Sequence, residues 1–342
     1  MNLQSIARKL ATVSLVLTFV VIVAGSIVRM TGSGMGCPDW PKCFGYYIPP
    51  TDVSTLSYQT GRAYGEGQMV LHHDTLWVAQ SAVTAVDAFD RAQWYKYPKH
   101  DYAIFNVWHT WIEYINRLAT VVYGLPLVLL AVVSTLIFFK RKGASLMLLS
   151  FGALFMVGFE AWLGKLVVDG NLIEHSITYH MLGSLGLVVL LSIMVFRMSE
   201  TRVEFSGVSA RVKRLTFLMM LLVFVQIILG TQVREHVDVI AKATANRHEW
   251  VDQLPGIFLV HRSFSILLVI VAILIYRGSR RFNVPAQLKL MLGVIGLEIL
   301  TGVVLAYLGM PAPAQPLHIL LGVLCFAFAL FAWMRIQFTT SS

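Results

Sequence analysis

Residues 118–139 read LATVVYGLPLVLLAVVSTLIFF, an apolar run without a single charged side chain. An α-helix needs about 20 such residues to cross the hydrocarbon core of a bilayer. Three further runs qualify in the same way, and four more qualify when one or two embedded polar side chains are allowed. The predicted spans are 10–28, 118–139, 144 to beyond 160, 176–196, 215–233, 255–276, 290 to beyond 298 and 315–334.

The composition agrees with a membrane protein. Of the 342 residues, 57% are apolar and only 13% are charged, against about 25% charged residues in an ordinary soluble protein. This excludes a soluble domain and a disordered chain, and three cysteines are too few for a disulfide-stapled miniprotein. We therefore predict an all-α integral membrane protein with eight transmembrane helices, of which the first is retained rather than cleaved as a signal peptide.

The distribution of charge predicts the orientation in the membrane. The net charge is +9, but one side of the predicted spans holds 15 Lys and Arg residues with two acidic residues, a net +13, and the rest of the chain sums to −4. Lys and Arg gather on the cytoplasmic side of membrane proteins, so both termini are expected in the cytoplasm, and nucleic-acid binding has no support. The residues counted are Arg8, Lys9, Lys140, Arg141, Lys142, Arg197, Arg202, Arg211, Lys213, Arg214, Arg277, Arg280, Arg281, Lys289 and Arg335, with Glu200 and Glu204.

The longest predicted loop, residues 30–101, faces outward. Within it, residues 74–96 suggest an amphipathic helix that lies on the membrane surface. Trp94, Tyr95 and Tyr97 would then be aromatic residues at the membrane interface.

Two cysteines follow the first span, in the motif C-P-D-W-P-K-C from Cys37 to Cys43. The two prolines between them let the chain fold back so that the thiols meet. An oxidising outer compartment favours a disulfide at this position. The sequence leaves open whether it is a plain structural bridge or takes part in redox exchange.

An internal repeat divides the chain into two four-helix halves, residues 1–200 and 201–342. The pattern G-x-E-x-x-x-G around Glu160 recurs around Glu298, and the same displacement along the chain, called the repeat shift below, carries His180 onto His318. Carboxylates inside a bilayer are costly, so the two glutamates are expected to make interhelical hydrogen bonds or to take part in chemistry. Two further matches are Gly25-Ser26-x-Val28-Arg29 with Gly230-Thr231-x-Val233-Arg234, and Asn116-Arg117 with His261-Arg262.

Three histidines, His180, His261 and His318, lie near the outer ends of even-numbered spans at matching depth. Two histidines on facing helices of a four-helix bundle can hold one haem by axial ligation, which makes His261 and His318 the candidate ligand pair of the second half. Arg262 and Arg234 lie near the same interface and would pair with the haem propionates. Zinc is less favoured, because no third or fourth ligand lies at this depth.

The first half differs chemically from the second. His180 is matched there with Asn116, a poor iron ligand, and Glu113 lies one turn earlier on nearly the same helix face. The second half has Phe258 at the position of Glu113. The difference suggests one electron-transfer haem and one reacting haem. His109 lies about 10 Å further out on the same face and does not reach the same iron without a bend.

Together these motifs resemble the heme A synthase family over roughly residues 10–335. The shared features are R-M-T-G-S-G at 29–34, the cysteine motif, E-Y-I-N-R-L at 113–118, and the histidines of the even-numbered spans. The resemblance implies a bacterial inner-membrane enzyme that oxidises the C8 methyl group of haem O to the formyl group of haem A, for cytochrome c oxidase. It also implies sites near the outer face and associates the cysteine pair with redox and haem handling.

The resemblance also implies roles for individual residues. His261 and His318 would bind a haem b cofactor, and Glu113 would be the catalytic carboxylate of the first half. The residues implied to bind haem O are His180, Asn116, Arg117 and Arg29. The family pattern E-x-x-H-R has His where this chain has Asn116, so we expect His180 to hold the substrate iron alone, with water or a weak ligand opposite.

The implied partners are haem O, haem O synthase and cytochrome oxidase assembly factors, within a lipid bilayer, and a homo-oligomer is compatible with the sequence. The alternative function is a non-catalytic dihaem b-type cytochrome or a haem-delivery protein using the same ligands. A transporter is less favoured, because the polar residues cluster outward rather than at mid-membrane. The oligomeric state, the electron acceptor and the source of oxygen are not readable from the residues.

Overall fold

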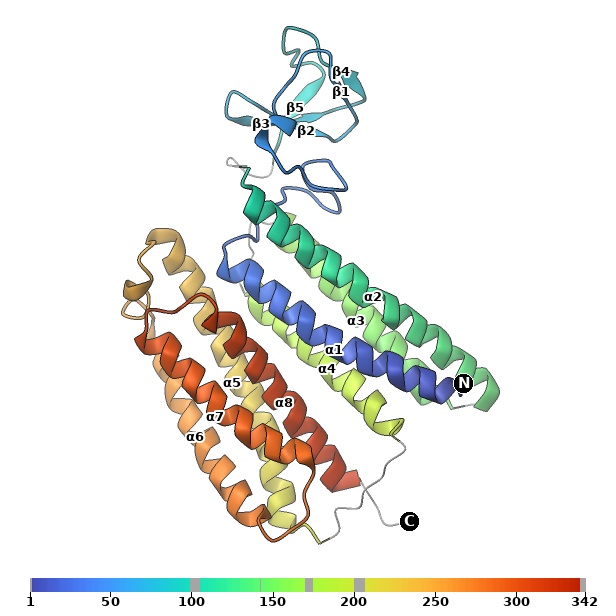
Figure 1. Ribbon diagram of the computed structural model, residues 1–342, viewed down its shortest axis with the longest axis vertical. Helices are drawn as coiled ribbons and strands as arrows, with labels where there is room; N and C mark the ends of the chain where they lie inside the picture. The colour runs from blue at the N-terminus through green and yellow to red at the C-terminus, as the bar shows by residue number, and fades with distance from the viewer. Residues whose placement is uncertain (1, 99–104, 142, 170–174, 200–206, 339–342) are drawn as a thin grey trace. The chain divides into compact units, whose positions relative to one another are not determined.

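Eight long helices form most of the part of the chain that the structure describes (Figure 1). The computed structural model describes residues 2–98, 105–141, 143–169, 175–199 and 207–338. Each of the eight helices is long and apolar enough to cross a membrane, which confirms the predicted spans and the all-α fold class. The helices are α1 (Leu3–Met30), α2 (Val107–Arg141), α3 (Ala144–Asp169), α4 (Ser176–Arg197), α5 (Ala210–Ala243), α6 (Gly256–Ser279), α7 (Ala286–Tyr307) and α8 (Ala314–Phe338).

Two helices are longer than a bilayer requires. Helix α2 has 35 residues and α5 has 34, against the about 20 needed to cross the hydrocarbon core. Helix α5 continues to Ala243, ten residues beyond the end of the predicted span 215–233. An ion pair one turn apart, from Arg234 to Asp238 at 2.5 Å, supports this extension.

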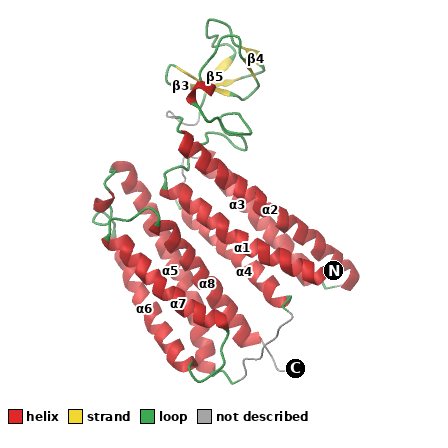
Figure 2. Cartoon of the chain, in the orientation of Figure 1, coloured by secondary structure: helices red, strands yellow, loops and turns green. Residues whose placement is uncertain are grey.

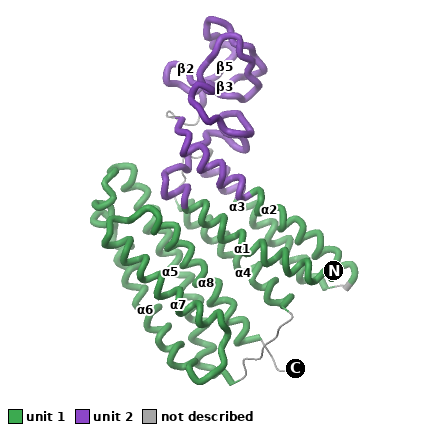
Figure 3. Tube along the Cα trace, viewed as in Figure 1, with its two compact units in different colours: residues 1–26, 121–160, 175–342 green, residues 27–120, 161–174 purple. Residues whose placement is uncertain are grey.

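The chain divides into two compact units (Figure 3). Unit 1 comprises Met1–Ser26, Val121–Glu160 and His175–Ser342, and unit 2 comprises Ile27–Thr120 and Ala161–Glu174. The division into halves 1–200 and 201–342 stays a prediction, and its boundary falls outside the described residues. Four residues used to predict the orientation, Lys142, Glu200, Arg202 and Glu204, also lie outside the described residues.

Unit 1 is held together by helix packing. Helix α5 packs on α6 and α8, α7 packs on α6 and α8, and α4 packs on both α5 and α8. Thr18 of α1 donates a hydrogen bond to the hydroxyl of Tyr123 in α2, at 3.0 Å. In a bilayer such close packing and interhelical hydrogen bonds replace the hydrophobic effect as the source of helix association.

The described part of unit 2 contains two small antiparallel sheets, drawn in yellow in Figure 2. They lie in the segment that connects α1 to α2 along the chain. The strands are β1 (Ala63–Tyr64), β2 (Met69–His72), β3 (Thr75–Ala79), β4 (Val83–Thr84) and β5 (Trp94–Lys96). One sheet pairs β1 with β4, and the other has the order β2-β3-β5. His73 and Asp74 form the tight turn between β2 and β3, with φ of 49° and 53°. Positive φ at both central residues is typical of a type I′ hairpin turn.

The amphipathic helix predicted over residues 74–96 is wrong, because this segment forms strands β3, β4 and β5. Side chains alternate along β3: Leu76 and Val78 join the apolar cluster around the cysteines, whereas Trp77 and Ala79 join an aromatic cluster. Both faces of the strand therefore have apolar partners, and a period of two fits this burial where a helical period does not.

Two of the three predicted interfacial aromatics are also corrected. Trp94 is 2% exposed and packs edge-on against Tyr64 inside unit 2. Tyr97 is 6% exposed, and its hydroxyl donates a hydrogen bond to the carbonyl of Pro38. These rings stabilise the small sheets rather than lie at a membrane surface, and of the three only Tyr95 is exposed.

Candidate functional site

The two histidines predicted as a pair lie together in unit 1. The rings of His261, in α6, and His318, in α8, have centroids 6.3 Å apart and are inclined by 83°. Metal–imidazole bonds are about 2 Å long, so two imidazoles on opposite sides of one metal ion have centroids about 6 Å apart. The observed spacing is therefore one at which both imidazoles would hold the same iron.

His318 is held by a carboxylate and a hydroxyl. Glu298 Oε2, in α7, lies 2.6 Å from His318 Nδ1, and Thr301 Oγ1 lies 2.8 Å from the same nitrogen. Thr301 in turn donates to the backbone carbonyl and to Oε2 of Glu298, at 3.0 and 3.3 Å. With Nδ1 engaged in this way, Nε2 is the ring nitrogen left for a metal.

His261 has a different environment. The side-chain amide of Gln226, in α5, donates to the backbone carbonyl of His261 at 3.0 Å. Among the described residues, His261 Nδ1 and Gln226 Oε1 are buried without a hydrogen-bond partner. A Cβ atom added at Gly230 would lie 3.1 Å from His261 Cε1, so this glycine leaves room for the ring.

The first-half histidine repeats the carboxylate contact. Glu160 Oε2, in α3, lies 2.6 Å from His180 Nδ1, in α4. The repeat shift relates this pair to Glu298 and His318. The expected interhelical hydrogen bonds of Glu160 and Glu298 are confirmed, and their partners are two of the three candidate iron ligands, His180 and His318.

The two arginines predicted beside the second-half pair lie in different surroundings. Arg234 donates to Gln315 Oε1 at 2.6 Å and pairs with Asp238. Arg262 is exposed, and its guanidinium lies over the ring of Phe258 at 5.8 Å. Arg234 therefore links α5 to the first turn of α8, while Arg262 presents its charge at the surface.

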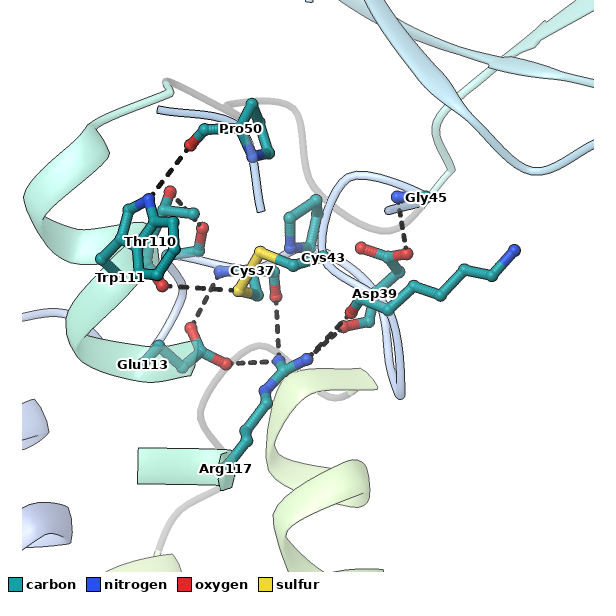
Figure 4. Close-up of a disulfide and its surroundings, with 12 residues drawn as sticks. Cys37, Asp39, Cys43, Gly45, Pro50, Thr110, Trp111, Glu113 and Arg117 are labelled. Atoms are coloured by element: carbon teal, nitrogen blue, oxygen red, sulfur yellow. Dashed lines mark hydrogen bonds and ion pairs between the residues drawn. A yellow bond between two sulfur atoms is a disulfide. The ribbon is translucent and has the colours of Figure 1, made fainter. Parts of the chain in front are cut away.

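A second polar centre lies in unit 2, around the disulfide between Cys37 and Cys43 (Figure 4). Glu113, in α2, is buried, and its Oε2 accepts from the backbone N–H of Cys37 at 2.8 Å. Its Oε1 accepts from the guanidinium of Arg117, one turn further along the helix. Both carboxylate oxygens of Glu113 are thus occupied by protein donors.

Arg117 binds residues 37–43 directly, and we call this segment the cysteine loop. Its guanidinium donates to the carbonyls of Asp39 at 2.6 Å, Lys42 at 3.0 Å and Cys37 at 3.3 Å. We call Glu113, Arg117 and these loop groups the loop clamp. A planar guanidinium with several fixed donors suits such a set of carbonyls better than an ammonium group does.

Two further contacts fit the loop to α2. A Cβ atom at Gly36 would lie 2.3 Å from the carbonyl oxygen of His109, so only glycine fits there. Thr110 Oγ1 donates to the carbonyl of Gly36 at 2.8 Å. Asp39 accepts from the N–H of Gly45 at 2.9 Å, and burial raises the pKa of its carboxyl.

The remaining predicted site residues also belong to unit 2. Asn116 is half-buried, and its Oδ1 is buried without a hydrogen-bond partner among the described residues. Arg29 lies half-buried in the last turn of α1, and His109 lies half-buried in the first turn of α2. His180 and Glu160 belong to unit 1.

Sequence reasoning missed the loop clamp and the part played by Thr301. The repeat shift singled out Glu160, Glu298, His180 and His318. It did not predict that each glutamate contacts the histidine of the next helix. Within the described ranges, no group of three or more His, Cys, Asp or Glu side chains is placed to hold a metal ion alone. A metal at His261 and His318 would need further ligands, such as the four nitrogens of a porphyrin.

Comparisons with known proteins agree with the resemblance read from the motifs. A family model described as cytochrome oxidase assembly protein matches residues 8–80 and 78–330. A heme A synthase from Shewanella oneidensis is 29% identical over 224 residues, which cover 65% of this chain and 54% of that relative. The match therefore spans about half the length of the relative.

Proposed function

The chain belongs to the cytochrome oxidase assembly protein family, and from this premise we propose that it is a membrane oxidoreductase of haem A synthesis. In this proposal it oxidises the C8 methyl group of haem O, through the alcohol and a hydrated aldehyde that loses water, to the formyl group of haem A, and an external electron acceptor takes up the four electrons removed. The similarity to a heme A synthase supports the substrate class. The observation that carries the proposal is the spacing of His261 and His318.

The second half is the proposed cofactor site, where His261 and His318 would hold haem b. Bound there, haem b would supply one-electron transfer. Glu298 and Thr301 orient the His318 ring, as their contacts with its Nδ1 indicate. Arg262 is a proposed partner of the propionates because its charge is exposed at the surface.

Arg234 is the second proposed propionate partner. It already binds Gln315 and Asp238. Its proposed contribution is therefore positive charge near the outer ends of α5 and α8, rather than direct hydrogen bonds to a propionate. Opposite charge near a propionate stabilises the bound group even without a direct bidentate contact.

The first half is the proposed substrate site. His180 would bind the iron of haem O, with Asn116 at the position that mirrors His261. Arg29 and Arg117 complete the proposed haem O-binding set. Because the guanidinium of Arg117 is committed to three loop carbonyls, its proposed contribution is to shape the outer loop beside the substrate.

Glu113 is the proposed catalytic carboxylate. Both of its oxygens accept hydrogen bonds, which is the capacity of an ionised carboxylate. In that form it would accept a proton released at the reacting methyl carbon, or stabilise positive charge developing there. The same contacts give it a second task, which is to anchor the cysteine loop.

The proposed setting is the inner membrane of a bacterium, with both termini in the cytoplasm and the haem sites near the outer face. Haem O synthase would supply the substrate, and cytochrome oxidase assembly factors would receive the product. The charge bias along the sequence supports this orientation.

The test is co-expression of the full chain with a haem O synthase in a host that makes no haem A, followed by mass analysis of extracted haems. We expect haem A, and little or none of it with His318→Ala or Glu113→Gln. Glu249→Gln, a change at an exposed carboxylate, is the control and should leave the yield unchanged. Bound haem with neither haem A nor a hydroxylated intermediate would refute the enzyme and favour the dihaem cytochrome.

A further inference from the structure

Two carboxylate–imidazole pairs occur at repeat-related positions. Glu160 contacts His180 Nδ1 and Glu298 contacts His318 Nδ1, both through Oε2 and both at 2.6 Å. One pair joins α3 to α4 and the other joins α7 to α8. The recurrence of the same ring nitrogen at the same distance indicates that both glutamates serve the imidazoles rather than helix packing in general.

Two glycines make room for the carboxylates. A Cβ atom added at Gly183 would lie 1.7 Å from Glu160 Oε1, and one added at Gly322 would lie 2.8 Å from Glu298 Oε1. Neither glycine has a positive φ, so space rather than backbone conformation requires them. Each glycine lies one turn after the histidine of its own helix, at positions 183 and 322. Each histidine helix thus provides both the imidazole and the space for the glutamate.

A carboxylate behind an imidazole changes it as a ligand. When the carboxylate accepts the Nδ1–H proton, the lone pair stays on Nε2 and faces the metal. The contact also fixes the ring orientation and strengthens the nitrogen as a donor. A stronger donor stabilises the higher oxidation state of the iron that it binds.

The surroundings of the two pairs differ at Thr301. In the second half, Thr301 contacts both His318 Nδ1 and Glu298, and so locks the pair. The repeat shift matches Thr301 with Leu163, whose side chain has no hydrogen-bonding atom. Glu160 Oε1 is buried without a partner among the described residues, so Glu160 is held less firmly than Glu298.

We propose that Glu160 and Glu298 are positioning residues for the axial histidines His180 and His318, and that Thr301 makes the second-half ligand permanent while the first-half ligand stays releasable. The inference rests on the proposed function. A cofactor has to stay bound through many turnovers, whereas a substrate haem has to leave after each one. The presence of a hydroxyl in one half and its absence in the other matches that need.

The first experiment measures the reduction potential of haem b in the full chain, purified from a host that makes only haem b. Glu298→Gln keeps the size of the side chain but removes its charge. We expect the Fe(III)/Fe(II) equilibrium to shift about tenfold toward Fe(II), which is 59 mV for one electron. Glu249→Gln removes a charge from an exposed position and serves as the matched control. A shift no larger than that of the control would overturn the role of Glu298.

The second experiment measures how fast haem b leaves the chain for an excess of apomyoglobin. Loss of an outer-shell partner costs about 10- to 100-fold in metal affinity, so Thr301→Leu is expected to speed release about tenfold. Thr301→Ser keeps the hydroxyl and should restore slow release. Equal release rates for both variants would overturn the role of Thr301, and this test stands even if Glu298→Gln does not fold.

The first half is tested with the chain loaded with haem O in a host that also expresses a haem O synthase. Glu160→Gln should lower the amount of haem O that co-purifies, and Leu163→Thr should slow its release. No effect of either variant would overturn the releasable first-half ligand. A chain that binds no haem at all would instead refute the proposed function, whereas haem A formation with unchanged potentials and release rates refutes only this inference.

Discussion

Arg117→Ala is expected to open the cysteine loop. The change removes donors to three loop carbonyls and leaves Glu113 buried without its cation. Hydrogen bonds to charged groups contribute about 1.5–3 kcal/mol each but are not additive, and breaking one side of a buried ion pair costs about 3–5 kcal/mol. We therefore expect the free energy of loop opening to fall by about 3–5 kcal/mol.

The assay is the rate at which dithiothreitol reduces the disulfide in the full chain, followed by labelling of the released thiols. Cys37 and Cys43 are 0% and 1% exposed, so the reagent needs a local opening of the loop. At about 1.4 kcal/mol per tenfold, the predicted loss of about 3–5 kcal/mol corresponds to reduction that is ~10²- to 4 × 10³-fold faster. Cys325 is a free cysteine buried in α8. Its labelling does not depend on reduction of the disulfide and serves as the internal reference.

Two further variants sharpen this test. Arg117→Lys keeps the charge but lacks the planar fork, so it should fall between wild type and Arg117→Ala. In a double-mutant cycle with Glu113→Gln, the two changes should cost less together than the sum of their separate costs, because the second no longer breaks an ion pair. Arg91→Ala, an exposed change in unit 2, is the control. Reduction of Arg117→Ala within threefold of wild type would refute the loop clamp.

Three other predictions concern separate parts of the chain. Asn116→His should convert the first-half haem to a six-coordinate low-spin spectrum, and two low-spin bis-His haems already present in the wild type would contradict the single-ligand site. Because burial raises the pKa of Asp39 in the folded chain, its contribution to stability is fully present below the unfolded value of about 3.9 and is lost as pH rises through the raised pKa. The stability of Asp39→Asn relative to wild type should thus increase as pH rises from acid to neutral, because asparagine does not ionise. Thermal unfolding followed by near-ultraviolet circular dichroism measures this difference, and a difference that does not change with pH would count against the prediction. Asp74→Gly should stabilise the β2–β3 hairpin by up to about 1 kcal/mol, because glycine adopts the φ of 53° found there without strain; a lower unfolding temperature of unit 2 would contradict the turn assignment.

The membrane helices and the histidine pair were predictable because their signals are long or repeated. A run such as 118–139 has no stable alternative to a spanning helix once it is in lipid. The repeat shift placed His180 and His318 at equal depth, and the matched positions of His261 and Asn116 followed from the same alignment of helices. The adjacency of His261 and His318 then required only that the helices pack as a bundle.

The small sheets were not predictable from the same patterns. The turn at His73 and Asp74 lacks the glycine or asparagine that usually marks a type I′ turn. Without that turn, the alternation in residues 75–79 was too short to outweigh the polar and aromatic residues that follow, which read as an amphipathic helix. The burial of Trp94 depends on partners from other strands, and these are invisible in a local pattern.

The loop clamp was hidden for a different reason. Glu113 and Arg117 stood out in the sequence as charged residues near a membrane span, but their partners are backbone groups of residues 37–42. Every residue has a backbone carbonyl and all but proline have an N–H, so no residue type marks the segment that a buried guanidinium will bind. Sequence reasoning therefore assigned both side chains to haem chemistry and overlooked their hold on the loop.

One imidazole on α6 and one on α8 are proposed to hold a single haem iron, and the assignment of the second half depends on this pair. Electron paramagnetic resonance of the ferric full chain, purified from a host that makes only haem b, tests it most directly. We predict a low-spin signal that becomes high-spin in either His261→Ala or His318→Ala and persists in His180→Ala. A low-spin signal that survives both second-half substitutions would contradict the shared ligation.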